Sequence, residues 1–196
     1  MLFRTVTGPE LEAIYRFIRA KQRVTLDEVY AMFVPGVEHA STQSAEDAIA
    51  FLRSTRLVTG DNDAIGVSDY PDPDFRFAIL RTLRALETSS IKAYHALDPL
   101  YLLLLTKLFV LPDKLYIADV HTAANSLPEI EAVGGLSKEK IGAWKRVMEF
   151  LGVGYRAYNG FLCVYQPDLI ASLIEAASWL DLTLQSFFED HVSTYL

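Results

Sequence analysis

The sequence predicts a mostly α-helical protein with small β-hairpins. Two similar units are joined by a helical connector and followed by a C-terminal helical segment. Apolar residues recur at helical spacings of three and four over most of the chain, and short apolar runs flank two sets of turn residues. With 51% apolar and 22% charged residues, the 196-residue chain can bury a hydrophobic core. The expected boundaries are 1–70 for the first unit, 71–110 for the connector, 111–166 for the second unit and 167–196 for the C-terminal segment.

The first unit is predicted as three helices followed by a β-hairpin. Apolar residues at helical spacing follow Pro9, which is a residue typical of a first helical turn. Thr25, followed three residues later by a glutamate, has the pattern of a capping box and predicts a second helix over 26–33. A third helix is expected over 42–56, and a strand, an acidic turn and a second strand over 57–67.

The second unit repeats this plan. Its Asn159-Gly160 pair is the strongest short hairpin signal in the chain. Residues 48–58 align with 144–153, and in each stretch a helix is expected to run directly into a strand. The expected elements are a helix over 111–125, a short element over 127–133, a helix that Ser137 caps and Gly152 ends, and strands over 153–157 and 161–165 around the turn 158–160.

Three helices followed by a β-hairpin is the winged variant of the helix-turn-helix. Residues 9–67 and 111–165 therefore resemble the tandem winged-helix proteins. These include transcription regulators, subunits of archaeal and eukaryotic transcription machinery, and the kite subunits that accompany chromosome-condensing ATPases. The resemblance is one of element order, with no invariant motif. It implies either DNA binding or a role in a larger assembly.

The connector and the C-terminal segment are predicted to be helical. A breaker-rich stretch over 70–74 precedes helices expected over 75–86, 89–96 and 100–110, and 167–196 reads as one or two amphipathic helices. The apolar run from 97 to 111 is shorter than the ~20 residues of a membrane span and is interrupted by charges, which favours a buried helix and no membrane partner.

The net charge of −7 is unevenly distributed, and the second unit is locally basic. Residues 137–156 hold five bases and two acids. In a winged helix the third helix enters the major groove and the wing contacts the backbone, so we expect the second unit to bind double-stranded DNA. This would make the chain a non-enzymatic protein with a regulatory role or a place in a DNA-acting complex. The candidate nucleic-acid contacts are Lys138, Lys140, Lys145, Arg146, Arg156, Tyr158 and Asn159.

The first unit is less suited to DNA. Glu46 and Asp47 lie at the start of its third helix, where acids favour the helix dipole and oppose phosphates. A second basic patch requires the fold to bring five arginines together: Arg53, Arg56, Arg76, Arg81 and Arg84.

The C-terminal segment favours a different class of function. Residues 166–196 hold five acids and no lysine or arginine, which suits a protein partner better than a polyanion. The alternative to DNA binding is therefore an acidic winged-helix scaffold, a kite-like subunit of a larger assembly with no direct DNA contact. The segment either packs back on its own core or binds a partner, which would be another protein or a second copy in a homodimer. The candidate partner-binding residues are Trp179, Leu182, Phe187 and Phe188.

No catalytic, cofactor or metal-binding set stands out, so we expect no enzyme. The four histidines lack metal-ligand spacing, and Asp119 and His121 would not share a face of the helix expected over 111–125. Cys163 falls in a predicted strand, where a packed thiol is expected, and as the single cysteine it excludes an intramolecular disulfide. The N-terminus lacks the pattern of a secretory signal, which favours a cytoplasmic protein.

Overall fold

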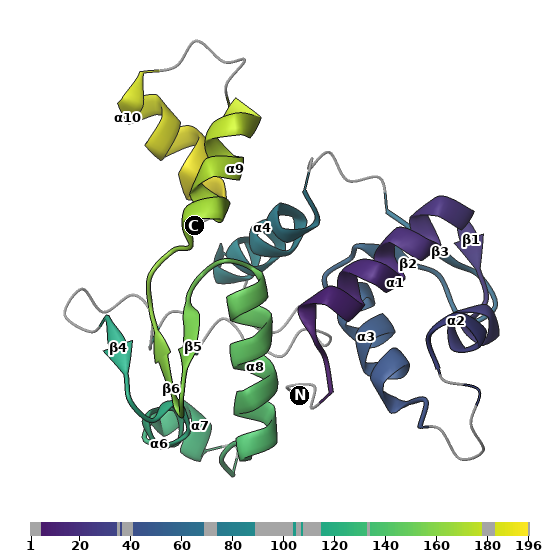
Figure 1. The fold of residues 1–196 in the computed structure, drawn as a ribbon, viewed down its shortest axis with the longest axis horizontal. Coiled ribbons are helices and arrows are strands. Elements are labelled where there is room, and N and C mark those ends of the chain that lie inside the picture. The colour runs from purple at the N-terminus through teal and green to yellow at the C-terminus, as the bar shows by residue number, and fades with distance from the viewer. Residues whose placement is uncertain are drawn as a thin grey trace.

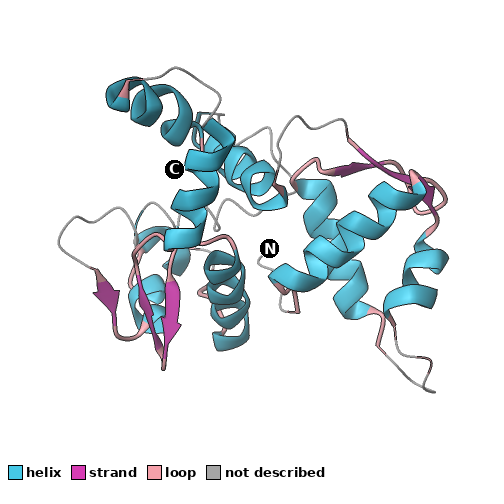
Figure 2. Ribbon diagram, turned by 45° about the horizontal axis from the view of Figure 1, so that its top comes forward, coloured by secondary structure: helices cyan, strands magenta, loops and turns pink. Residues whose placement is uncertain are grey.

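The computed structural model describes residues 5–34, 36, 41–68, 74–88, 104, 107, 115–132, 134–177 and 183–195. Helices predominate, as the sequence predicts, and small antiparallel sheets lie at opposite ends of the molecule (Figure 2). The helix expected over 89–96 and most of the one expected over 100–110 fall outside the described residues, as do Trp179 and Leu182. Within the described residues, no helix has the length and apolar character needed to cross a bilayer.

The first unit, residues 5–68, places a three-stranded sheet beside three helices (Figure 1). Strand β3 pairs with both other strands, giving the order β1-β3-β2. The capping box at Thr25 is confirmed, since its Oγ1 accepts from the Glu28 N–H at 3.2 Å and the Glu28 carboxylate accepts from the Thr25 N–H at 2.8 Å. The elements are α1 (Gly8–Lys21), β1 (Arg23–Val24), α2 (Leu26–Phe33), α3 (Gln43–Ser54), β2 (Val58–Thr59) and β3 (Ile65–Val67).

The second unit, residues 115–166, has the same sheet order, β4-β6-β5. The helix predicted over 111–125 is wrong at its centre, because Tyr116 and Ile117 form a strand and the helix begins only after Asp119. The strand exists through pairing with β6, a partner more than forty residues away that local spacing does not reveal. The elements are β4 (Tyr116–Ile117), α6 (Val120–Asn125), α7 (Pro128–Glu131), α8 (Lys138–Phe150), β5 (Tyr155–Ala157) and β6 (Gly160–Leu162).

The β5–β6 hairpin is shorter than predicted and has a two-residue turn. Ala157 pairs with Gly160, and Tyr158 rather than a glycine takes the left-handed conformation, with φ of 52°. Gly160 belongs to the strand. A Cβ there would lie 2.4 Å from the Ile117 carbonyl oxygen, so the glycine permits the close approach of β4.

Helices α3 and α8 end in the same hydrogen-bonded turn. In α3 the N–H groups of Arg56 and Leu57 donate to carbonyls three and five residues earlier, at 2.9 and 3.0 Å. Gly152 and Val153 make the same two bonds after α8, both at 3.1 Å. This is the Schellman motif, with a left-handed residue at Arg56 and at Gly152. These residues are 96 positions apart, as are 48 and 144, so the geometry supports the sequence alignment of the two units.

The two units meet where α1, α4 (Phe75–Thr88) and α8 converge (Figure 1). Helix α1 approaches so closely that a Cβ at Gly8 would lie 1.9 Å from the Phe150 ring. The Phe75 ring fills the junction, with its centroid 5.1 Å from that of Tyr15 and 6.2 Å from that of Phe150. Buried side chains of both units form one hydrophobic cluster.

The C-terminal segment packs back on α4. Arg76 bonds Asp168 at 2.9 Å, and Arg81 donates to the Tyr195 hydroxyl at 2.9 Å. Leu169 and Tyr195 are buried. Of the two predicted roles of this segment, packing on its own core is therefore observed. Its elements are α9 (Pro167–Ala177), α10 (Leu184–Ser186), a π-helical turn (Phe187–His191) and a 3-10 turn (Val192–Thr194).

Gly152→Ala should lower the free energy of unfolding by about 2 kcal/mol or more. The φ of 83° strains any L-residue by ~1–2 kcal/mol, and the new Cβ would lie 2.8 Å from the Leu169 Cβ. Gly134→Ala is the matched control, because its φ is 84° and nothing lies within 4 Å of the added carbon. Urea unfolding of both variants measures the difference. Equal losses would show that the Leu169 contact adds nothing.

Candidate functional site

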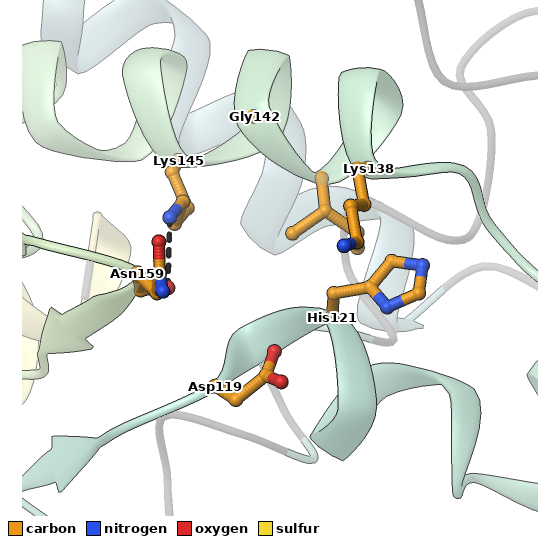
Figure 3. A pocket seen from close by; sticks show the side chains of 7 residues that line it. Asp119, His121, Lys138, Gly142, Lys145 and Asn159 are labelled. Carbon is orange, nitrogen blue, oxygen red and sulfur yellow. Dashed lines mark hydrogen bonds between the residues drawn. The ribbon is translucent and has the colours of Figure 1, made fainter.

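A groove of about 250 Å³ opens between the first half of α8, the start of α6 and the β5–β6 turn (Figure 3). We call it the α8 groove. Three of the predicted nucleic-acid contacts line it together: Lys138, Lys145 and Asn159. The full lining is Asp119, His121, Lys138, Ile141, Gly142, Lys145 and Asn159.

The amphipathic pattern of α8 directs Lys138 and Lys145 to the groove. Ser137 begins the helix by accepting a hydrogen bond from the Lys140 N–H, as predicted. The apolar stripe is buried, with Trp144 packing on Phe161 at 5.9 Å between ring centroids. Lys138 and Lys145 are two helical turns apart, so they lie along one flank of the helix, away from this stripe.

Lys145 joins the helix to the hairpin turn. Its Nζ donates to the Asn159 carbonyl oxygen at 3.0 Å (Figure 3). Partial burial lowers the pKa of Lys145, and the positive charge of Arg156 lowers it further, while Asp119 acts in the opposite direction. The ammonium group is thus held in place at one end of the groove, and Lys138 stands beside His121 at the other end.

Arg156 binds Glu149 and does not line the groove. Its Nε lies 2.5 Å from the Glu149 carboxylate, and its backbone N–H donates to the same carboxylate at 2.9 Å. Both groups are partly exposed. The carboxylate offsets the charge of this predicted phosphate contact, so the local positive charge comes chiefly from the side chains on α8 itself.

The expectation that Asp119 lies within a helix together with His121 is wrong, because Asp119 precedes α6 as its N-cap. Its carboxylate accepts hydrogen bonds from the Thr122 N–H at 3.1 Å and the Thr122 hydroxyl at 2.7 Å. These two bonds are the main cause of a lowered pKa at Asp119. Asp119 and His121 consequently line the same wall of the groove. The N-cap preference of aspartate was the sequence signal that could have placed them.

Gly142 lies in the middle of α8 and faces the groove. A Cβ at this position would lie 3.7 Å from Nη1 of Arg146, which is ordinary van der Waals contact. The packing of the described residues around position 142 therefore does not require a glycine. In a helix interior, glycine lowers stability by about 1 kcal/mol relative to alanine. Because Gly142 has no side chain, the groove is open at this position.

The other predicted contacts do not line the groove. Lys140 and Arg146 are half-buried on α8, and Tyr158 is fully exposed at the tip of the turn. Taken together, the groove offers ammonium groups as donors to anionic oxygens and the Asp119 carboxylate as an acceptor. Nowhere in the described part of the chain do three His, Cys, Asp or Glu side chains gather to hold a metal ion.

The corresponding helix of the first unit presents acids. Glu46 accepts from the Tyr30 hydroxyl at 3.1 Å, and Asp47 accepts from the Thr5 hydroxyl at 2.7 Å. Arg53 donates to the Asn62 side chain across the β2–β3 turn. Two more arginines of the predicted second patch, Arg76 and Arg81, bind the C-terminal segment, and the side chain of Arg84 lies outside the described residues.

Among the remaining candidates, Phe187 and Cys163 are partly buried and Phe188 is exposed. Phe187 packs against the core and Phe188 is 55% exposed, with the two rings in edge contact at 5.5 Å. The Cys163 thiol is half-buried, and this burial raises its pKa to about 11, so it is a protonated, packed group at neutral pH.

Comparisons with protein-family models, curated proteins and solved structures found nothing that matches this chain.

Gly142→Ala should raise the free energy of unfolding by about 0.5–1 kcal/mol, because alanine is the better helix former and its Cβ has room. Gly154→Ala is the contrasting variant, since its Cβ would lie 1.9 Å from the Phe161 ring, and it should destabilise. Chemical denaturation measures both changes. A loss of stability in Gly142→Ala would mean that the fold itself requires this glycine.

Asp119→Ala should destabilise the protein at neutral pH and lose this effect in acid. The folded-state pKa of Asp119 lies below its ordinary value of 3.8, so its contribution is present above that value and is lost as the pH falls through the folded pKa. Thermal unfolding of wild type and variant between neutral and acidic pH gives the profile. Asp63→Ala, in the exposed turn of the first unit, controls for the change in net charge. A pH-independent difference would contradict the role of the ionised cap.

Proposed function

We propose that the chain is a tandem winged-helix protein without enzymatic activity that binds double-stranded DNA through its second unit. The observation that carries the proposal is the meeting of Lys138, Lys145 and Asn159, from a helix and a hairpin turn, in one groove. Helix and turn are the two parts with which winged helices contact DNA. The binding would serve regulation or a DNA-acting complex.

The assignment of winged helices is supported by the order of elements. In both units a short strand precedes two or more helices and pairs with the second strand of the following hairpin. In this assignment α3 and α8 are the third helices, and the β2–β3 and β5–β6 hairpins are the wings. The shared Schellman turn between helix and hairpin supports the equivalence of the two units.

The charges of the two helices favour an unequal division of roles. Lysines on α8 can neutralise phosphates, whereas Glu46 and Asp47 on α3 would repel them. The glycine at 142 lets a sugar–phosphate backbone approach α8 closely. DNA would therefore contact the second unit alone, with the Asp119 carboxylate available to accept from a base amino group.

The second candidate function is an acidic protein-interaction scaffold with no direct DNA contact, resembling a kite subunit. It is favoured by Leu184 and Phe188, which are 74% and 55% exposed in a segment that holds acids and no lysine or arginine. Exposed apolar patches on a protein surface mark sites of interaction with other proteins. A chain that retains no duplex at low salt while it binds another protein through this segment would favour the scaffold.

Lys138→Gln and Lys145→Gln should each weaken DNA binding and reduce its salt dependence. Each lost phosphate contact should make the slope of log K against log salt less negative by about 0.9. Fluorescence anisotropy with a labelled duplex, measured over a salt series, gives the slopes. Lys21→Gln is the matched control, because it removes an exposed lysine from α1 of the first unit.

Two outcomes would contradict the proposal. One is wild-type protein that binds no duplex at low salt. The other is a Lys21→Gln slope that changes as much as the slopes of the α8 variants, which would show a diffuse charge effect in place of contacts in the groove. Circular dichroism of each variant checks that α8 remains folded.

A further inference from the structure

The outer face of the second sheet carries a row of exposed aromatic side chains. Tyr116 on β4 and Tyr155 on β5 both pair with Leu162 on the central strand β6. Residues directly opposite each other point to the same face of a sheet, so the three side chains form one row, which we call the tyrosine row. Tyr116 is 49% exposed and Tyr155 is 37% exposed.

This face points away from the α8 side of the sheet. The alternate strand residues face α8, because Phe161 packs on Trp144 and Arg156 pairs with Glu149. The pleat places the tyrosine row, with Ala157 and Gly160, on the opposite face. The Tyr116 hydroxyl extends over Gly160, where a Cβ would lie 2.7 Å from it, so the glycine lets the ring lie close to the sheet.

The first unit shows that the fold does not require this row. The same position in its sheet holds Arg23 and Thr59 opposite Gly66. The strand order is the same in both sheets, and the hairpin positions 59 and 66 lie 96 residues before 155 and 162. A polar row therefore supports this topology, and the aromatic row of the second unit needs another explanation.

We propose that the tyrosine row is the interface of a homodimer. The strand residues on this face are uncharged, in a chain of net charge −7, so two copies can meet here without placing charge against charge. The row is also symmetric across the sheet, with a tyrosine on each side of Leu162. A two-fold axis that passes over Leu162 and runs across the strands would set each tyrosine against the same tyrosine of the second copy, which is an isologous contact. Tyrosine is among the residues that contribute most at such interfaces.

The inference goes beyond DNA binding, because it concerns the face of the sheet opposite α8 and is tested without DNA. The face is small, so we expect a dimer that depends on concentration. Sedimentation equilibrium of the full chain from about 1 to 200 µM should show a monomer–dimer equilibrium, since interfaces at the small end of the range bind weakly.

The decisive variant copies the first unit. Tyr116→Arg with Tyr155→Thr reproduces the row of Arg23 and Thr59, which the same topology accommodates, and should weaken dimerisation by roughly tenfold or more. Tyr155→Thr alone is the second variant, should the double variant fail to fold, and it should also weaken the dimer. Tyr158→Asn is the matched control, because this tyrosine lies in the turn outside the row and asparagine tolerates its left-handed backbone, and it should leave the equilibrium unchanged.

Three results would overturn the inference. Wild-type protein that stays monomeric over the whole range has no such interface. Folded row variants that dimerise as well as wild type place the interface elsewhere. A dimer that is lost on Leu184→Ser with Phe188→Ser, and kept in the row variants, belongs to the C-terminal segment instead.

Discussion

The contact of α1 with α8 at Gly8 is the constraint on which the arrangement of the two units depends. Any side chain at this position would overlap the Phe150 ring, so the backbone of one unit packs directly on a helix of the other. Phe75 of α4 closes the junction from a third side, between Tyr15 and Phe150. Because Phe150 is the last residue of α8, the junction uses the end of that helix and leaves its first half open to the groove.

The two units share a backbone plan and differ in what they present. The same sheet order recurs, and the turn that follows α3 recurs after α8 at a spacing of 96 residues. On this common frame, α3 presents acids held by hydroxyl groups, while α8 presents lysines, of which Lys145 is held by the hairpin turn. The outer faces of the sheets differ in the same manner, since one has an arginine and a threonine where the other has tyrosines. The two units therefore share a backbone arrangement, and the differences between their exposed side chains indicate different roles.

Much of the fold follows from local sequence signals. The capping box at Thr25 gave the correct bounds of α2, and the apolar stripe of α8 gave the correct buried face. Strands β1 and β4 could not be found in this way, because each has two residues and exists only by pairing with a strand about forty residues further along the chain. A two-residue segment shows no alternation that a sequence pattern could detect.

The candidate site could likewise be predicted only in part from local sequence signals. Lys138, Lys145 and Asn159 were predicted because the helix and the hairpin could each be placed by local spacing. The Glu149 partner of Arg156 and the position of Asp119 in the groove depend on how α6, α8 and β5 pack together. The tyrosine row likewise depends on strand register, since nothing in the sequence around Tyr116 shows that it stands beside Leu162.

A map of the residues that contact DNA tests most directly whether the second unit binds the duplex. Amide resonances of the full chain, followed by NMR while a duplex is added at low salt, report each backbone position separately. DNA binding through the second unit predicts shifts concentrated at 138–146 on α8 and at 155–160 on the hairpin. Helix α3 should be unaffected, because the cations lie on α8 and the hairpin and the acids lie on α3. Shifts centred on α3, or none at any position, would contradict it.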